Sequence, residues 1–162
     1  LLVGDNPANS AMRGFLSFDL SFISSGAVGI ESAILNLYKQ TSHGDPYRAL
    51  ENCPIPCVTG AEIALTHVSY GDSLTTQDFD TPSLAALGYI DNRFKPFSTL
   101  FIDVTPALQD DLVNRVARGN RSQYRLNFPV ATNNDSRFDD VSFVTADSSS
   151  NPPLLVVTYL IP

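Results

Sequence analysis

The chain has 162 residues, of which 43% are apolar and 17% are charged, so it can form one folded domain with its own core. Acidic residues outnumber basic ones, giving a net charge of -7, and the Lys and Arg residues form no cluster. Binders of nucleic acid or of anionic membranes need clustered positive charge, so the composition argues against both partners. No apolar run approaches the roughly 18 residues that span a bilayer.

Short apolar stretches between Gly, Pro, Asn, Asp and Ser predict an all-β antiparallel sandwich, jelly-roll-like, with residues 1–162 in a single domain. Alternating side chains predict strands at residues 12–20 and 33–38. Further strands are expected at residues 63–70, 100–104, 124–128 and 141–145, the last as a short partner of the final strand. The final strand, residues 154–159, is apolar on both parities, which predicts a central strand buried on both faces. The side chains expected in the core are Leu16, Phe18, Ala33, Leu35, Leu37, Leu100, Ile102, Leu126 and Phe128.

One short helix is predicted, from Pro106 to Arg118. Thr105 is expected to cap it, and Gly119 lies just beyond its end. Helical spacing predicts that three side chains pack against the sandwich: Leu108, Leu112 and Val116. The same spacing predicts that four polar side chains face water: Asp110, Asp111, Asn114 and Arg118. We therefore expect a packing helix across one end of the sandwich.

Four segments, taken in order, carry a resemblance to a known family. They are Arg-Gly-Phe-Leu-Ser-Phe-Asp-Leu-Ser at 13–21, Ile-Glu-Ser-Ala-Ile-Leu-Asn-Leu-Tyr at 30–38, Asp-Val-Thr at 103–105, and Pro-Leu-Leu-Val-Val-Thr-Tyr at 153–159. The chain resembles the DNRLRE-domain family of extracellular β-sandwich modules, except in its middle part. The resemblance implies a strand before the segment that matches residues 1–5. The chain would then be a fragment, or a sheet whose missing strand is supplied from elsewhere.

The two cysteines, Cys53 and Cys57, flank a Pro-Ile-Pro segment. A redox motif has two residues between its thiols and a structural zinc site needs more ligands, so neither fits. A local disulfide is the preferred prediction, and two free thiols in a cytosolic loop are the alternative. Sequons at Asn120 and Asn134 allow glycosylation. Both features favour a secreted, extracellular or cell-surface location.

The acidic segment from Asn133 to Asp140 is the best candidate for an ion site. Calcium prefers carboxylate and amide oxygens gathered in a loop, which nominates Asp135, Asp139 and Asp140 as ligands of a structural ion. The segment lacks the glycine and the final glutamate of an EF-hand loop, and a solvated turn is the alternative. No other cofactor is indicated.

Groups for catalysis are sparse in this sequence. It has two histidines, His43 and His67, and no Gly-x-Ser-x-Gly nucleophile motif. His43 is expected in a solvated loop, and His67 is expected to be a packing or surface residue. Carboxylate pairs at 78/80 and 139/140 could be nominated for glycoside hydrolysis. Sequence neighbours such as 139 and 140 point to opposite faces if the chain is extended, so they do not form an acid/base pair across a cleft. We predict that the chain is not an enzyme, with a hydrolase as the third reading.

The predicted function is that of a non-catalytic structural or adhesive module. It is expected to associate with itself, or with neighbouring surface proteins, by β-strand addition at a sheet edge, and so to build a filament or matrix. The alternative is a carbohydrate-binding module that recognises a polysaccharide. Stacking on sugars needs exposed aromatic faces, for which the candidates are Tyr38, Tyr47, Tyr70 and Tyr89. The negative charge argues against acidic polysaccharides such as alginate.

Overall fold

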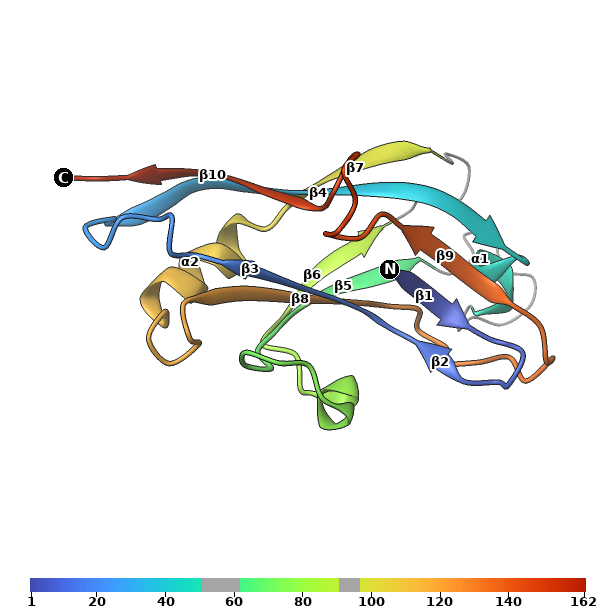
Figure 1. Ribbon diagram of the computed structural model, residues 1–162. Helices are drawn as coiled ribbons and strands as arrows, with labels where there is room; N and C mark the ends of the chain where they lie inside the picture. The colour runs from blue at the N-terminus through green and yellow to red at the C-terminus, as the bar shows by residue number, and fades with distance from the viewer. Residues whose placement is uncertain (51–61, 91–96) are drawn as a thin grey trace.

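A computed structural model describes residues 1–50, 62–90 and 97–162 and consists mainly of two antiparallel sheets packed as two layers (Figure 1). The prediction of an all-β sandwich is confirmed. Alternating apolar residues in both sheets explain the layers, because each sheet buries one face against the other.

The first sheet contains six strands built around the long strand β4. Its members are β1 (Leu2–Asp5), β2 (Ala11–Met12), β4 (Gly29–His43), β7 (Ser98–Asp103), β9 (Asp139–Phe143) and β10 (Leu154–Leu160). The strand order is β10-β4-β9-β1-β2, and β7 also pairs with β4. Ile34 pairs with both Val156 and Asp103, so β10 and β7 lie on opposite edges of β4. Lys39 pairs with both β7 and β9, so β9 follows β10 along the same edge of β4.

The second sheet contains four strands in the order β3-β8-β5-β6. They are β3 (Gly14–Asp19), β5 (Ile63–Val68), β6 (Ala85–Ile90) and β8 (Arg121–Asn127). The inward residues of the two sheets share one core, and all nine side chains predicted for the core belong to it or pack against it. The predicted faces of these strands are therefore confirmed.

Three short helices complete the described part of the chain. They are α1 (Pro46–Ala49), the 3-10 helix η1 (Thr76–Asp80) and α2 (Thr105–Val113). Helix α2 lies against β4 and β8, and Leu108 and the partly buried Leu112 contact the core as predicted. Its end was predicted wrongly, because the helix stops at Val113 and Val116, in the turns that follow, is 93% exposed.

Three polar residues of this region also differ from the prediction. One is Arg118, whose side chain is 14% exposed rather than in water because it bonds to the buried Asp111. Thr105 does not cap α2, because its Oγ1 accepts a hydrogen bond from the Ala33 N–H of β4. The Oδ1 of Asp103 instead accepts from the Thr105 N–H. Asp111 is fully buried rather than in water, because it follows Ala107 and Leu108 by one turn and so lies on the packed side of the helix.

Strand β10 was predicted to be central and is an edge strand. It pairs with β4 along one side, and none of the described residues pairs with its other side. Its burial alternates, so one apolar set packs on the core and the other faces outward. The expected partner segment, residues 141–145, instead contributes to β9, which pairs with β1 and β4. A strand with apolar residues at both odd and even positions is thus not necessarily buried on both faces.

Candidate functional site

The carboxylates nominated as calcium ligands lie at the end of the sandwich where β9 begins. Asp139 and Asp140 are adjacent in β9 and interact with different groups. The Asp139 carboxylate accepts hydrogen bonds from the Asp45 N–H at 2.8 Å and from the Asn133 side-chain amide at 3.0 Å. Asp140 lies 3.1 Å from Nδ1 of His43, whose side chain is 59% exposed. His43 was expected in a loop and is instead the last residue of β4.

Asp135 lies in the exposed loop before β9 and accepts a hydrogen bond from the Arg137 N–H. It shares with Asp139 a shallow depression of about 260 Å³, which is also lined by Asp45, Arg48 and Arg137. Asp140 is not part of that lining. The structure therefore brings two of the three nominated residues together. No group of three or more Asp, Glu, His or Cys side chains among the described residues is arranged to hold a metal ion.

Asp5 belongs to the same end of the sandwich and was missed in the sequence. It lies directly opposite Asp139 in the β1–β9 pairing and is 0% exposed. Its Oδ2 accepts a hydrogen bond from the Asn133 N–H at 3.3 Å, while its Oδ1 is buried without a partner. A signal was present, because Asp5 shares its parity in the strand with the core residue Val3.

A second polar cluster is buried between α2 and the second sheet. Nε2 of His67 lies 2.8 Å from Oδ1 of Asp111, and Arg118 donates to the same oxygen at 2.5 Å. Arg118 also donates to Asp110 at 2.6 Å. The His67 ring rests against Tyr124, whose hydroxyl accepts a hydrogen bond from Ser122 at 2.7 Å. His67 is thus a packing residue, as predicted, and it ties α2 to β5.

The burial and charge of this cluster shift two pKa values. Desolvation raises the pKa of the Tyr124 hydroxyl well above its usual value. Burial by itself would lower the pKa of Arg118, but the hydrogen bonds to Asp111 and Asp110 raise it overall. Ser122, Tyr124, His67 and Asp111 are all buried. The arrangement stabilises the packing of α2 and presents no reactive group at the surface.

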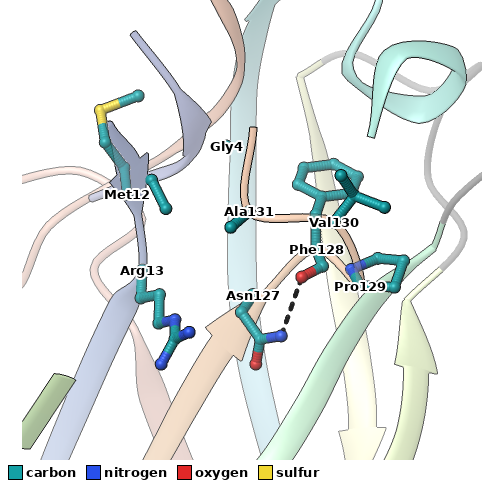
Figure 2. Close-up of a pocket in the computed structure, with 9 residues that line it drawn as sticks. Gly4, Met12, Arg13, Asn127, Phe128, Pro129, Val130 and Ala131 are labelled. Carbon is teal, nitrogen blue, oxygen red and sulfur yellow. Dashed lines mark hydrogen bonds between the residues drawn. The ribbon is translucent and has the colours of Figure 1, made fainter. Parts of the chain in front are cut away.

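A small pocket of about 80 Å³ lies where β2 leads into β3, beside the segment after β8 (Figure 2). The charged side chain in its lining is Arg13. The Arg13 guanidinium already donates hydrogen bonds to Asp80 at 2.8 Å and to the Phe79 carbonyl. The Asn127 amide donates to the neighbouring Phe128 carbonyl at 2.9 Å. The lining offers no acid, base or nucleophile, so this pocket carries no argument for catalysis.

The carboxylates nominated for glycoside hydrolysis have other contacts. Asp78 accepts hydrogen bonds from the backbone and side chain of Thr75, which lower its pKa and cap η1. Asp80 pairs with Arg13.

The four tyrosines considered for sugar stacking do not form a common surface. Tyr47 is buried against Phe128, and Tyr70 packs edge-on against Phe15. Tyr38 is half-buried, which leaves Tyr89 on β6, at 70% exposure, as the open aromatic face among the four. One ring is a weak platform for a polysaccharide, because such sites usually present several aromatic faces.

The remaining nominated residues are three modification sites. The Asn120 side-chain carbonyl accepts hydrogen bonds from Arg115 at 3.0 and 2.7 Å, so this sequon is held within the fold. Asn134 lies exposed in the loop before β9. Cys53 and Cys57 lie outside the described residues, so their disulfide stays a prediction.

A scan against models of known protein families finds no match, and a search of curated proteins finds none either. The resemblance to DNRLRE-domain modules therefore stays a hypothesis based on the four segments. Among the described residues, no helix is both long enough and apolar enough to cross a membrane.

Proposed function

We propose that this chain is a non-catalytic structural or adhesive module that works outside the cytoplasm and assembles with further copies of itself through the free edge of β10. The observation that supports the proposal is an edge strand with its hydrogen-bonding groups open and its outward side chains apolar. Unpaired strand edges of this kind are templates for strand addition.

The backbone bonds of β4 identify which groups of β10 are open. Both the N–H and the C=O of Ala33 are directed away from β10, toward Thr105 Oγ1 and the Val104 N–H. Ala33 is paired with Val157, so the polar backbone groups of Val157 point away from β4 as well. Directions alternate along a strand, which places Leu155 and Tyr159 in the same open set. The Leu160 carbonyl accepts from the Val28 N–H on the β4 side and agrees with this alternation.

The side chains of β10 provide none of the usual protection of an edge. Its sequence, Leu-Leu-Val-Val-Thr-Tyr-Leu, holds no charge and no proline. Leu154, Val156 and Leu160 are 51%, 53% and 50% exposed, so the outward face of the strand is apolar. The extra residue of the bulge in the β10–β4 pairing is Glu31, which lies on β4 and leaves β10 regular.

The other edge strands are better protected. Strand β7 carries Asp103, and β3 carries Asp19. Strand β6 contains a bulge at Leu87 and Gly88 with a positive φ of 111°, features that twist an edge away from pairing. Strand β2 has two residues. The comparison favours β10 as the edge that accepts another strand.

A second copy of β10 is a suitable partner. Antiparallel pairing centred on Val157 would place Leu155 opposite Tyr159 of the second copy, so all three open residues find equivalent groups. Such a contact is two-fold symmetric and closes as a dimer. Pairing with another edge of the second copy would instead be head-to-tail and would extend as a filament.

A proline at Val157 tests the proposal. Proline removes an N–H that belongs to the open edge and not to the β10–β4 pairing, so the fold should tolerate it. The matched control is Val157→Ala, which loses similar packing but keeps the N–H. Sedimentation velocity over a concentration series should show assembly of the wild type and of Val157→Ala, while Val157→Pro stays monomeric. Circular dichroism checks that both variants are folded.

A monomeric wild type at every concentration would contradict the proposal. So would assembly of Val157→Pro with the same concentration dependence as Val157→Ala. If the proline variant does not fold, Val156→Lys puts a charge on the exposed face of the same strand and should weaken assembly. Electron microscopy of the assembled wild type then distinguishes dimers from filaments.

A further inference from the structure

We propose that Asp5 and Asp139 together hold one hard divalent cation, of the calcium class, at the end of the sandwich where β1 meets β9. The proposal is independent of assembly through β10. It differs from the site expected from the sequence, because Asp5 replaces Asp135 and Asp140 as the partner of Asp139.

The first argument is the charge balance of the two carboxylates. Asp5 and Asp139 are directly opposite one another on antiparallel strands, an arrangement in which Cβ atoms lie about 4.5–5.5 Å apart on one face. They are 0% and 4% exposed. Among the described residues, no Lys, Arg or His forms an ion pair with either one. Two like charges side by side and out of water call for a positive partner.

The second argument is the unsatisfied oxygen of Asp5. Both oxygens of Asp139 accept a hydrogen bond, from Asp45 N–H and from the Asn133 amide. Asp5 accepts a single long bond through Oδ2, and its Oδ1 is buried without a partner. A buried carboxylate oxygen without a partner is costly. A cation between the two strands would satisfy this oxygen and offset both charges.

The donor atoms indicate the class of ion. Two carboxylates are present, and water molecules can complete the coordination of a hard cation held by them. His43 interacts with Asp140 and not with this pair, so the donors are oxygen atoms, which calcium prefers over softer metals. With two charged ligands, we expect weak binding, with a Kd of about 10⁻⁴–10⁻³ M, the range of extracellular calcium modules.

The backbone of Gly44 and of Asn133 packs closely around the two carboxylates. Gly44 has a positive φ of 62°, and a Cβ there would lie 2.3 Å from Oδ1 of Asp139. Asn133 bonds to Asp5 through its N–H and to Asp139 through its amide, so it spans both carboxylates. An ion bound here would fasten β1 to the loop before β9, and its effect would be on stability.

Thermal unfolding of chelator-treated protein, with calcium added back, tests the proposal. The wild type should show a melting temperature that rises with calcium and saturates in the millimolar range. Asp5→Asn should abolish this rise. Asp140→Asn, which changes a neighbouring carboxylate of the same strand, and Asp135→Asn should both keep it. Isothermal titration of the wild type should give one site per chain.

Calcium that leaves the wild-type melting temperature unchanged and produces no binding heat would overturn the proposal. A calcium response that survives Asp5→Asn but is lost in Asp135→Asn would overturn it too, and would return the site to the exposed loop. If Asp5→Asn does not fold, the stoichiometry and affinity from the titration of the wild type, Asp140→Asn and Asp135→Asn decide. Loss of binding in either of these variants would then contradict the assignment.

Discussion

Replacing Asp111 by alanine should destabilise the sandwich strongly, although the polar character of this residue led us to expect it in water. The change removes an acceptor shared by His67 and Arg118. Bonds to charged groups contribute about 1.5–3 kcal/mol each, and breaking a buried ion pair by removing one partner costs about 3–5 kcal/mol. Asp111 Oδ2 is buried without a partner, so its removal offsets part of the loss. We therefore expect about 3 kcal/mol of lost unfolding free energy, or roughly 6–12 °C in Tm.

The matched control for this variant is Asp110→Ala. Asp110 is the neighbouring carboxylate and bonds to the same Arg118, but its side chain is about half exposed. An exposed pair of this kind contributes about 0–1 kcal/mol, so this variant should be nearly silent. Equilibrium unfolding in urea gives both free energies at a common m-value. Equal losses in the two variants, both below about 1 kcal/mol, would refute the role assigned to the buried cluster.

Three further experiments test the core, the disulfide and the pH dependence of stability. Leu35→Ala, at a fully buried position, should cost about 2–5 kcal/mol in urea unfolding, and a loss below about 0.5 kcal/mol would mean that the faces of β4 are reversed. Alkylation of intact protein without reductant should label neither Cys53 nor Cys57, and labelling of both would contradict the predicted disulfide. Hydrogen bonds from the side chain and backbone of Thr105 lower the pKa of Asp103. The ionised Asp103 therefore stabilises the fold fully above its unfolded pKa of about 3.9, and this contribution is lost as the pH falls through the lowered folded pKa. The stability difference between wild type and Asp103→Asn should therefore shrink at acid pH, and a difference that is constant down to about pH 2 would contradict this.

The strands and their inward faces could be predicted because both depend on local alternation. Leu35 and Leu37 point inward with the period of a strand, and the partners across the sandwich do not alter that period. The position of β10 could not be predicted in this way. Its outward residues, Val156 and Leu160, are as apolar as its inward ones, and whether a further strand covers them depends on strand order, which involves contacts far apart in the sequence.

The predictions of the polar sites also failed because these sites depend on contacts between residues far apart in the sequence. Asp139 was nominated from its acidic segment, but its partner Asp5 lies at the other end of the chain and is identified by the pairing of β1 with β9. Asp111 was assigned to water because the carboxylate is polar. Its spacing from Ala107 and Leu108 places it on the packed side of the helix, but its buried partner there, His67, comes from a distant strand. Local patterns thus predict which residues point inward, and the register between strands decides which polar groups meet there.

Residue-resolved amide hydrogen exchange, measured at low and at high protein concentration, tests the assembly edge most directly. The amides of Val156 and Thr158 point toward β4 and should be protected at both concentrations. The amides of Leu155, Val157 and Tyr159 should exchange rapidly in dilute protein and become protected at high concentration, as a second strand pairs with them. Exchange at these three amides that does not depend on concentration, while the protein assembles, would contradict the assignment of β10 as the assembly edge.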